Sequence, residues 1–224
     1  MSTSEAQFAV ARREMLEIIA LHVQAVSAHI GKSALAEPVM AALGSIPRHE
    51  FVPEPLRQFA YLDQPLPIGS GKTIAQPFIV ALMTDLLDLQ TDDQVLEVGT
   101  GLGYQAAILA RLAEQVYSIE IIEELSRDAE YRLGKLDFGN VELRIGDGSS
   151  GWSEHAPFDK IIVTAAPELI PIGLLQQLRP GGRMVIPAGL ADAQQLMLVE
   201  KDQYGSLHTQ EILAVRFSPL VLVH

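Results

Sequence analysis

The chain of 224 residues contains no cysteine, which excludes disulfide bonds, thiolate catalysis and zinc sites built on thiolates. It is also poor in positive charge, with 16 Lys and Arg against 28 Asp and Glu and a formal net charge of −12. Because phosphate contacts depend on clustered Lys and Arg, we expect no direct binding to nucleic acid. The six histidines show no metal-ligand spacing with acids, so we expect no metal site.

Long apolar runs are also missing. No stretch approaches the roughly 20 apolar residues that span a bilayer, and the nearest candidate, residues 18–25, is short and contains His22 and Gln24. Residues 1–10 lack a basic region followed by an apolar stretch, which is the pattern of a secretory signal peptide. We therefore expect a cytoplasmic protein that does not bind membranes. The sequence does not indicate an oligomeric state.

Two patterns divide the chain near residue 92. Apolar residues recur near a helical period over residues 6–30, and further helices are predicted over 33–43 and 77–87. Residues 46–71 contain five prolines, which argues against long regular elements there. We expect residues 1–92 to form N-terminal helices and substrate-side loops. Residues 93–224 are expected to form an α/β core, and the two parts to pack as one compact unit.

After residue 92, short apolar segments alternate with helical ones. Strands are predicted over residues 95–98, 115–120, 141–145, 160–164, 183–187 and 195–200, and helices over 104–112, 122–136 and 169–178. Residues 211–219 are strand-like with no preceding helix, so we expect an antiparallel strand or hairpin at the end of the sheet. This pattern predicts an α/β fold with a doubly wound, mostly parallel sheet covered on both faces.

The most informative segment joins the first of these strands to the following helix and reads Val95-Leu96-Glu97-Val98-Gly99-Thr100-Gly101-Leu102-Gly103-Tyr104. Glycines let the backbone approach a ligand, and the helix N-terminus points at it. The pattern differs from the dinucleotide fingerprint G-x-G-x-x-G, because Tyr104 stands where the last glycine would be. Glu97 would repel a pyrophosphate and suits a ligand with an ammonium group and no phosphate. S-adenosylmethionine is such a ligand.

Two further acids support this cofactor. Glu120 ends the next strand, roughly 20 residues on, where an acid holds ribose hydroxyls in dinucleotide sites. Asp147, before Gly148 and after the third strand, offers a polar group near the adenine. The alternative, that the glycines only make a tight turn and the acids lie on the surface, stays open. The predicted cofactor residues on this basis are Glu97, Gly99, Thr100, Gly101, Gly103, Glu120, Asp147 and Gly148.

Six motifs outside the glycine segment carry a more particular similarity. They are Pro47-Arg48-His49-Glu50-Phe51-Val52-Pro53, Leu66-Pro67-Ile68-Gly69, Thr73-Ile74-Ala75-Gln76-Pro77, Ala156-Pro157-Phe158-Asp159, Ile161-Ile162-Val163-Thr164-Ala165-Ala166-Pro167 and Arg216-Phe217-Ser218-Pro219-Leu220. In this order, over about residues 33–221, the chain resembles the bacterial protein-L-isoaspartate O-methyltransferases. The resemblance implies the seven-stranded methyltransferase fold. It also implies methyl transfer from S-adenosylmethionine, leaving S-adenosylhomocysteine, to the α-carboxylate of isoaspartyl residues in damaged peptides and proteins, which initiates their repair.

One position departs from the family pattern. The family usually reads T-I-S, with an active-site serine, where this chain reads Thr73-Ile74-Ala75. The resemblance implies that Thr73 and Ile74 contact the cofactor and that Thr73 and Ala75 occupy the catalytic position. We expect the methyl acceptor to lie against Ile68 and against the residues at the end of the fourth predicted strand, Thr164, Ala165, Ala166 and Pro167.

The chemistry does not depend on the missing hydroxyl. A carboxylate with a pKa near ~4 is already ionised at neutral pH, so no general base is required. A serine would orient the acceptor through one hydrogen bond, worth roughly 0.5–1.5 kcal/mol or about tenfold in rate. We expect Ala75 to weaken the activity rather than abolish it. A natural variant, an introduced substitution and a different carboxylate substrate all remain compatible with Ala75, as does a cofactor-binding module that has lost activity.

Overall fold

The computed structural model describes residues 4–221 and is built around one seven-stranded sheet in the order β5-β4-β3-β6-β7-β8-β9. The first five strands in this order are parallel to one another, β8 pairs antiparallel with β7, and β9 pairs antiparallel with β8, which confirms the expected closing hairpin. The strands are β3 (Gln94–Val98), β4 (Gln115–Glu120), β5 (Val141–Ile145), β6 (Phe158–Val163), β7 (Leu178–Ala188), β8 (Gln195–Lys201) and β9 (Leu207–Ala214). The doubly wound, mostly parallel α/β fold is confirmed.

The helices follow the predicted order with shifted ends. They are α1 (Glu5–Ala25), α2 (Ser27–Ile30), α3 (Glu37–Ser45), α4 (Pro77–Leu87), α5 (Tyr104–Ala110), α6 (Glu123–Lys135) and α7 (Ile172–Gln177), with 3₁₀ turns η1 (Arg48–Phe51), η2 (Glu54–Phe59), η3 (Gly148–Ser150) and η4 (Ser153–His155). The single helix predicted over residues 6–30 is wrong, because the helix is interrupted at Val26. Helix α3 begins later than predicted, since Pro38 is suited to a first helical turn.

A short hairpin was absent from the sequence prediction. Strands β1 (Leu66–Gly69) and β2 (Lys72–Ile74) pair antiparallel through a turn at Ser70 and Gly71, both with positive φ. The prolines of this region argued against regular structure. They are tolerated because the ribbon has only two strands, where a missing N–H leaves no interior ladder bond unmade. The hairpin matters because it carries Ile68, Thr73 and Ile74 into the functional site described below.

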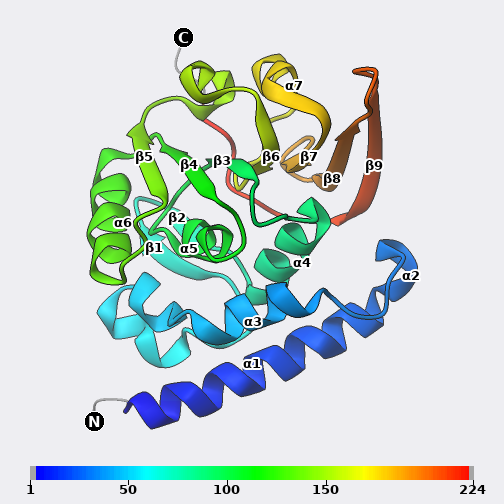
Figure 1. Ribbon diagram of the computed structural model, residues 1–224. Coiled ribbons are helices and arrows are strands. Elements are labelled where there is room, and N and C mark those ends of the chain that lie inside the picture. The colour runs from blue at the N-terminus through cyan, green and yellow to red at the C-terminus, as the bar shows by residue number, and fades with distance from the viewer. Residues whose placement is uncertain (1–3, 222–224) are drawn as a thin grey trace.

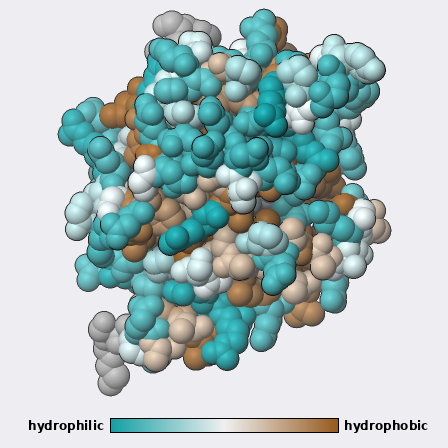
Figure 2. Space-filling model, in the orientation of Figure 1, coloured by the Kyte–Doolittle hydropathy of each residue, from teal (hydrophilic) through white to brown (hydrophobic). Residues whose placement is uncertain are grey.

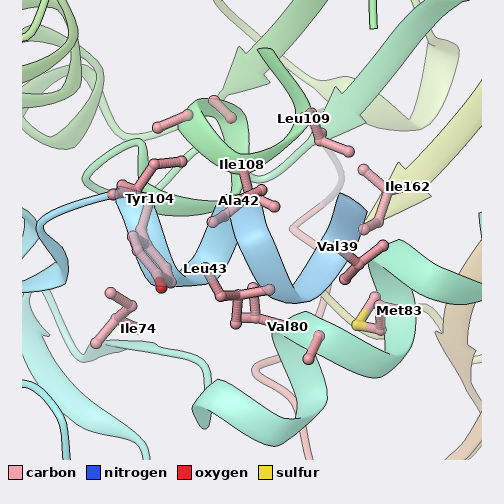
Figure 3. Packing of buried hydrophobic residues seen from close by; sticks show 14 of the residues in the cluster. Val39, Ala42, Leu43, Ile74, Val80, Met83, Tyr104, Ile108, Leu109 and Ile162 are labelled. Carbon is pink, nitrogen blue, oxygen red and sulfur yellow. The ribbon is translucent and has the colours of Figure 1, made fainter. Parts of the chain in front are cut away.

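Apolar layers cover both faces of the sheet. Val95 faces a large cluster with side chains from α1, α3, α4, α5 and α6, whereas its neighbour Leu96 faces a second cluster with Trp152 and Leu174 of α7. Figure 1 shows α1 along one end of the molecule, next to α3 and α4, with α6 and α7 at opposite sides of the sheet. Figure 3 shows side chains of α3 packed between those of α4 and α5.

The connection order brings loops from distant strands to one edge. Strands β3, β4 and β5 progress toward one side of the sheet, and β6 then returns to the other side of β3. In open parallel sheets this reversal is where a ligand binds, beyond the carboxyl ends of the strands. The register pairs Val98 with both Ile119 and Val163, so the turns that follow these residues are neighbours.

The outer surface is mainly polar on the face shown in Figure 2, where apolar side chains form small groups between hydrophilic ones. None of the helices among residues 4–221 is both long and apolar enough to cross a membrane.

Candidate functional site

A cleft with two connected lobes lies at this carboxyl edge. The larger lobe has a volume of about 500 Å³ and the smaller of about 80 Å³. Small-molecule sites usually measure roughly 300–1,000 Å³, so the two lobes together are of ordinary size for a ligand with its co-substrate. Both lobes are bordered by the same six residues, which we call the shared wall: Ile68, Thr73, Gly99, Gly101, Thr164 and Ser218.

The glycine turn after β3 forms the floor of the cleft. Gly99 has a φ of 97°, and a Cβ there would lie 2.3 Å from the Thr164 hydroxyl oxygen. That hydroxyl donates hydrogen bonds to the carbonyls of Gly99 and Val98, at 2.6 and 3.1 Å. Only glycine satisfies both the backbone angle and the close approach. The turn is therefore clasped to the end of β6 by Thr164.

Glu120 organises the same turn from the neighbouring strand. One oxygen of its carboxylate accepts a hydrogen bond from the Gly101 N–H at 2.8 Å, and the other accepts one from the Ile122 N–H at 2.9 Å. A carboxylate has about four acceptor positions, so about two remain free. Glu120 lines the smaller lobe together with Gly146 and Gly148. It is thus placed to accept hydrogen bonds from a ligand diol while holding the glycine turn.

Glu97 occupies a different environment from the one that the sequence suggested. It is fully buried beneath the turn and does not line either lobe among the described residues. One of its oxygens accepts a hydrogen bond from Ser118, whose hydroxyl oxygen lies 2.6 Å from that of Thr100 in the larger lobe. Its other oxygen has no hydrogen-bond partner among residues 4–221. A bound donor group would satisfy that oxygen, so the cofactor role of Glu97 stays a prediction.

Burial dominates the ionisation of Glu97. It raises the pKa of this carboxyl to about 8, although the Ser118 hydrogen bond opposes the rise; the negative charge of Glu120 adds to it. At neutral pH the group is therefore mainly protonated. The two acids that the sequence treated alike differ in environment, since Glu120 borders the cleft and Glu97 is buried beneath the glycine turn.

The hairpin and the start of α4 form the opposite wall. Thr73 is exposed and borders both lobes, whereas Ile74 is buried and borders only the larger one. Ala75 lines the larger lobe next to them. The structure thus brings the segment with the missing hydroxyl into the same cleft as the glycine turn.

A buried arginine holds this wall in place. Arg48 in η1 is fully buried, and its guanidinium donates to the carbonyls of Ala75 at 2.6 Å and Ala60 at 2.8 Å. It also lies over the ring of Tyr104, 4.7 Å from the centroid. Burial lowers the pKa of Arg48. The motif around Arg48 therefore supports the Ala75 segment from behind and does not itself line the cleft among the described residues.

The small residues after β6 divide into two groups. Thr164 and Ala165 line the cleft, but Ala166 and Pro167 are buried away from both lobes. The N–H of Ala166 donates to the Ser218 carbonyl at 2.8 Å, and its carbonyl accepts from Leu220 at 2.9 Å. Ala166 thus holds the C-terminal segment across the cleft, which explains its small size without a contact to substrate.

Asp147 lies between two residues that line the smaller lobe and is not itself among the lining residues, so its contact with the cofactor stays a prediction. Its side chain accepts a hydrogen bond from the Ser149 N–H at 2.8 Å and caps η3, while Gly146 and Gly148 line the smaller lobe. A Cβ on Gly148 would lie 2.4 Å from a methyl carbon of Val98, so the chain must pass close to β3 here. The third predicted element of the cofactor site is therefore formed mainly by backbone.

Several lining residues were not among the predicted site residues. Helix α4 contributes Ile79, Val80 and Met83, α5 contributes Tyr104 and Gln105, and the end of β9 with the chain that follows it contributes residues 214–218. The motif at residues 216–220 was the one sequence signal that could have located the last group. No group of three or more His, Asp or Glu residues within the described range could hold a metal ion.

Comparisons with known proteins agree with this geometry. The family model described as protein-L-isoaspartate(D-aspartate) O-methyltransferase matches residues 24–223. A protein-L-isoaspartate O-methyltransferase 1 from Polaromonas sp. is 58% identical over 97% of this chain and 92% of its own length. A protein-L-isoaspartate O-methyltransferase 2 from Syntrophobacter fumaroxidans is 55% identical over 97% of this chain and 88% of its own.

Solved structures agree with this fold. One protein-L-isoaspartate O-methyltransferase structure superposes with a TM-score of 0.79 at 28% identity, covering 93% of this chain and 65% of that longer chain. A putative protein-L-isoaspartate O-methyltransferase from Plasmodium falciparum, solved with S-adenosyl-L-homocysteine, has a TM-score of 0.76 at 20% identity and shares the fold; it covers 94% of this chain and 98% of its own. Taken with the family match over most of its length, these similarities show that the chain belongs to the protein-L-isoaspartate(D-aspartate) O-methyltransferase family.

Proposed function

We propose that the two lobes of the cleft divide the two reactants of this family's reaction between them. The chain is an S-adenosylmethionine-dependent methyltransferase that acts on L-isoaspartyl residues of proteins. In our proposal the adenosine part of the cofactor lies at the smaller lobe and the isoaspartyl residue in the larger lobe. The observation that carries the proposal is the shared wall, because it brings the glycine turn and the Thr73 segment together where the lobes meet.

The smaller lobe fits the cofactor in its donors and charges. Glu120 keeps free acceptor positions for ribose hydroxyls after it has bound the turn. The orphaned oxygen of Glu97 would be satisfied by a donor such as the cofactor's ammonium group, directly or through a water molecule. When bound, S-adenosylmethionine supplies a methyl group made electrophilic by a sulfonium sulfur. The proposed cofactor contacts are completed by Thr73, Ile74, Gly99, Thr100, Gly101, Gly103, Asp147 and Gly148.

The larger lobe fits a peptide acceptor. Its walls combine apolar side chains of α4 with the small Ala75, and the lobe is open enough to admit a residue still attached to a chain. Ile68, Thr164 and Ala165 border the position where acceptor and cofactor would meet. Excluding water from an ionised carboxylate and aligning it with the methyl group are the main tasks of such a site.

Ala75 removes one orienting group without removing the reaction. The acceptor carboxylate is ionised at neutral pH and needs no base. The hydroxyl of Thr73 lies two residues away on the same wall, and the position of the Ala75 main chain is fixed by Arg48. We therefore propose that the chain retains isoaspartyl methylation at reduced turnover.

The test is a pair of peptides that differ only in one linkage. Methyl incorporation from labelled S-adenosylmethionine is measured for an isoaspartyl peptide and for its normal aspartyl twin. The proposal predicts labelling of the isoaspartyl peptide and little of its twin. Equal labelling would indicate another carboxylate substrate. Cofactor binding by calorimetry without labelling of either peptide would indicate a binding module.

The remaining expectations stay proposals with their own support. Residues 1–92 and 93–224 are proposed to fold as one unit, since one cluster of buried side chains contains Ile19 and Leu43 from the first part and Val95 and Ile162 from the second. We propose that the protein does not bind nucleic acid, and its net charge of −12 supports this. A cytoplasmic location agrees with the lack of cysteine.

A further inference from the structure

One unpaired cation faces the proposed acceptor site. Arg216 contributes the one charged side chain among the described residues that line the larger lobe. Its side chain is exposed, and no residue within 4–221 forms an ion pair or hydrogen bond with it. In a chain with a net charge of −12, most arginines near the core have acidic partners, as Arg57 and Arg132 do. An unpaired arginine in the wall of a cavity is placed to bind an anion.

The main chain on both sides of Arg216 is fixed by one buried residue, Gln194, through its side chain and its own main chain. The Gln194 side chain accepts from the Phe217 N–H at 2.6 Å and donates to the Phe217 carbonyl at 3.1 Å. The Val215 N–H donates to the Gln194 carbonyl at 3.1 Å. Gln194 is itself only 4% exposed. The residue between these anchors is therefore held at the cavity although it follows the last strand.

Four of the other polar side chains of the larger lobe are engaged in hydrogen bonds, whereas the hydroxyl of Tyr104 has no hydrogen-bond partner among the described residues. Thr100 contacts Ser118, Thr164 donates to the glycine turn, and the amide groups of Gln76 and Gln105 donate to Asp63 and Thr84 at 2.9 Å each. None of these groups is positively charged. With Ala75 in place of a serine, the neutral donors left to a carboxylate include the hydroxyls of Thr73 and Tyr104, and Arg216 supplies the one positive charge among the described residues that line this lobe.

We propose that Arg216 binds the α-carboxylate of the isoaspartyl residue and positions it for methylation; this rests on the proposed function of the larger lobe. A guanidinium donates through a planar fork that matches a carboxylate. Holding the carboxylate through part of its acceptor positions leaves a lone pair for bond formation. Lys72 is the cation of the smaller lobe, where it lies with Glu120, so it is less suited to this role.

The experiment is a double-mutant-type binding cycle that removes the charge of Arg216 from the protein or the α-carboxylate charge from the peptide. Calorimetry measures two peptides against protein saturated with S-adenosylhomocysteine: an isoaspartyl peptide, and the same peptide with its α-carboxylate replaced by a carboxamide. The proteins are wild type, Arg216→Gln and Arg216→Lys. Arg13→Gln is the matched control, because Arg13 is exposed on α1 and does not line either lobe among the described residues.

We expect Arg216→Gln to weaken binding of the carboxylate peptide by about 10- to 150-fold, the usual range for a hydrogen bond to a charged group. The carboxamide peptide should bind the wild type and Arg216→Gln equally, because its partner charge is already gone. Arg216→Lys should lie between, since it keeps the charge and loses the fork. Added salt should weaken the wild type more than Arg216→Gln. Affinity for S-adenosylhomocysteine, unchanged in all variants, verifies folding.

The outcomes separate the role of Arg216 from the proposed function of the larger lobe. Equal losses for both peptides, no loss for either, or no binding of the carboxylate peptide by wild type would overturn the role of Arg216. Methylation of the isoaspartyl peptide by wild type is measured in parallel. Methylation without the binding difference refutes Arg216 alone. A binding difference without methylation refutes the proposed function and leaves Arg216 as a carboxylate site.

Discussion

The two lobes of the cleft are built in different ways. The smaller lobe is made largely from the turns that follow β3, β4, β5 and β6, each of which leaves the sheet at the same edge. The β1–β2 hairpin and the segment after β9 border both lobes, and the larger lobe adds side chains of α4 and of the start of α5. The cofactor site can thus be formed mainly by the repeating geometry of the sheet, whereas the acceptor site depends more on the packing of helices against it.

The charged residues that support the two lobes, Glu120 for the smaller and Arg48 for the larger, show the same contrast. Glu120 accepts two backbone N–H groups of its own turns and stays at the surface of the cleft. Arg48 reaches across the fold to the carbonyl of Ala75 and is fully buried. The contacts of Glu120 follow from the pairing of neighbouring strands. The contact of Arg48 with Ala75 requires η1, η2 and the loops beside them to pack correctly. Damage to the smaller lobe should therefore act through the turn itself, and damage to the larger lobe through its support.

The largest effect is expected for Gly99→Ala. The left-handed backbone alone costs about 1–2 kcal/mol for a residue with a Cβ, and the 2.3 Å approach to Thr164 would displace the turn as well. We expect binding of S-adenosylmethionine to fall below detection in calorimetry. Gly205→Ala is the control, because Gly205 has a φ of 88° and a Cβ there would meet nothing within 4 Å. Similar cofactor affinity in both variants would contradict the described role of the turn.

Arg48→Lys should be the next most severe change. Lysine cannot reach both carbonyls with the geometry of a guanidinium, and losing one hydrogen bond to a charged group costs about 1.5–3 kcal/mol. Denaturant unfolding should show that loss of stability, together with a lower kcat/KM for the isoaspartyl peptide. Arg57→Lys, at a partly exposed arginine of the same region, should change stability little. Equal stability in the two variants would show that Arg48 does not hold the Ala75 wall.

Glu97→Gln tests the buried acid through pH. The folded-state pKa of about 8 lies above the ordinary value of 4.5, so the folded protein keeps a proton that the unfolded chain loses between these values. The contribution of this group to stability is complete below about pH 4.5, and it falls as pH rises to about 8, by at most about 1.4 kcal/mol per unit. Melting temperatures of wild type should therefore drop more than those of Glu97→Gln between about pH 6 and about pH 8.5. Glu130→Gln, on the exposed side of α6, should behave as wild type. Parallel curves for wild type and Glu97→Gln would mean that Glu97 is ionised in the fold.

The smallest effect is expected for Ala75→Ser. One added hydrogen bond to the acceptor is worth roughly 0.5–1.5 kcal/mol, so turnover of the isoaspartyl peptide should rise by up to about tenfold. Ala75→Gly, which adds no hydroxyl, should not raise turnover. A rise of several orders of magnitude would show that the hydroxyl has a role beyond orientation, and no change would show that Thr73 or the backbone already replaces it.

The sequence predicted the local half of the site well and the long-range half poorly. Strands β4 and β5 were predicted with their observed ends, and Glu120 lies at the turn as expected, because alternation and strand ends are local signals. Burial is not local, so neither the sealing of Glu97 nor the packing of Ala166 against Ser218 and Leu220 could be read from the pattern.

The acceptor side shows why composition can mislead. Prolines argued against regular structure at residues 65–67, yet the hairpin forms there because it pairs only with itself. The position of Arg216 depends on Gln194, which precedes β8 at the end of the strand pair where the chain leaves β9, so the two meet only through the register of that pair. Family resemblance supplied the motif at residue 216 but not its surroundings.

A structure of the protein with S-adenosylhomocysteine and an isoaspartyl peptide would test the division of the cleft most directly. We predict the ribose hydroxyls at Glu120 in the smaller lobe and the isoaspartyl carboxylate in the larger lobe beside Thr73 and Ala75, with the sulfur at the shared wall between them. A ribose bound away from Glu120, or a peptide that leaves the larger lobe empty, would contradict the account.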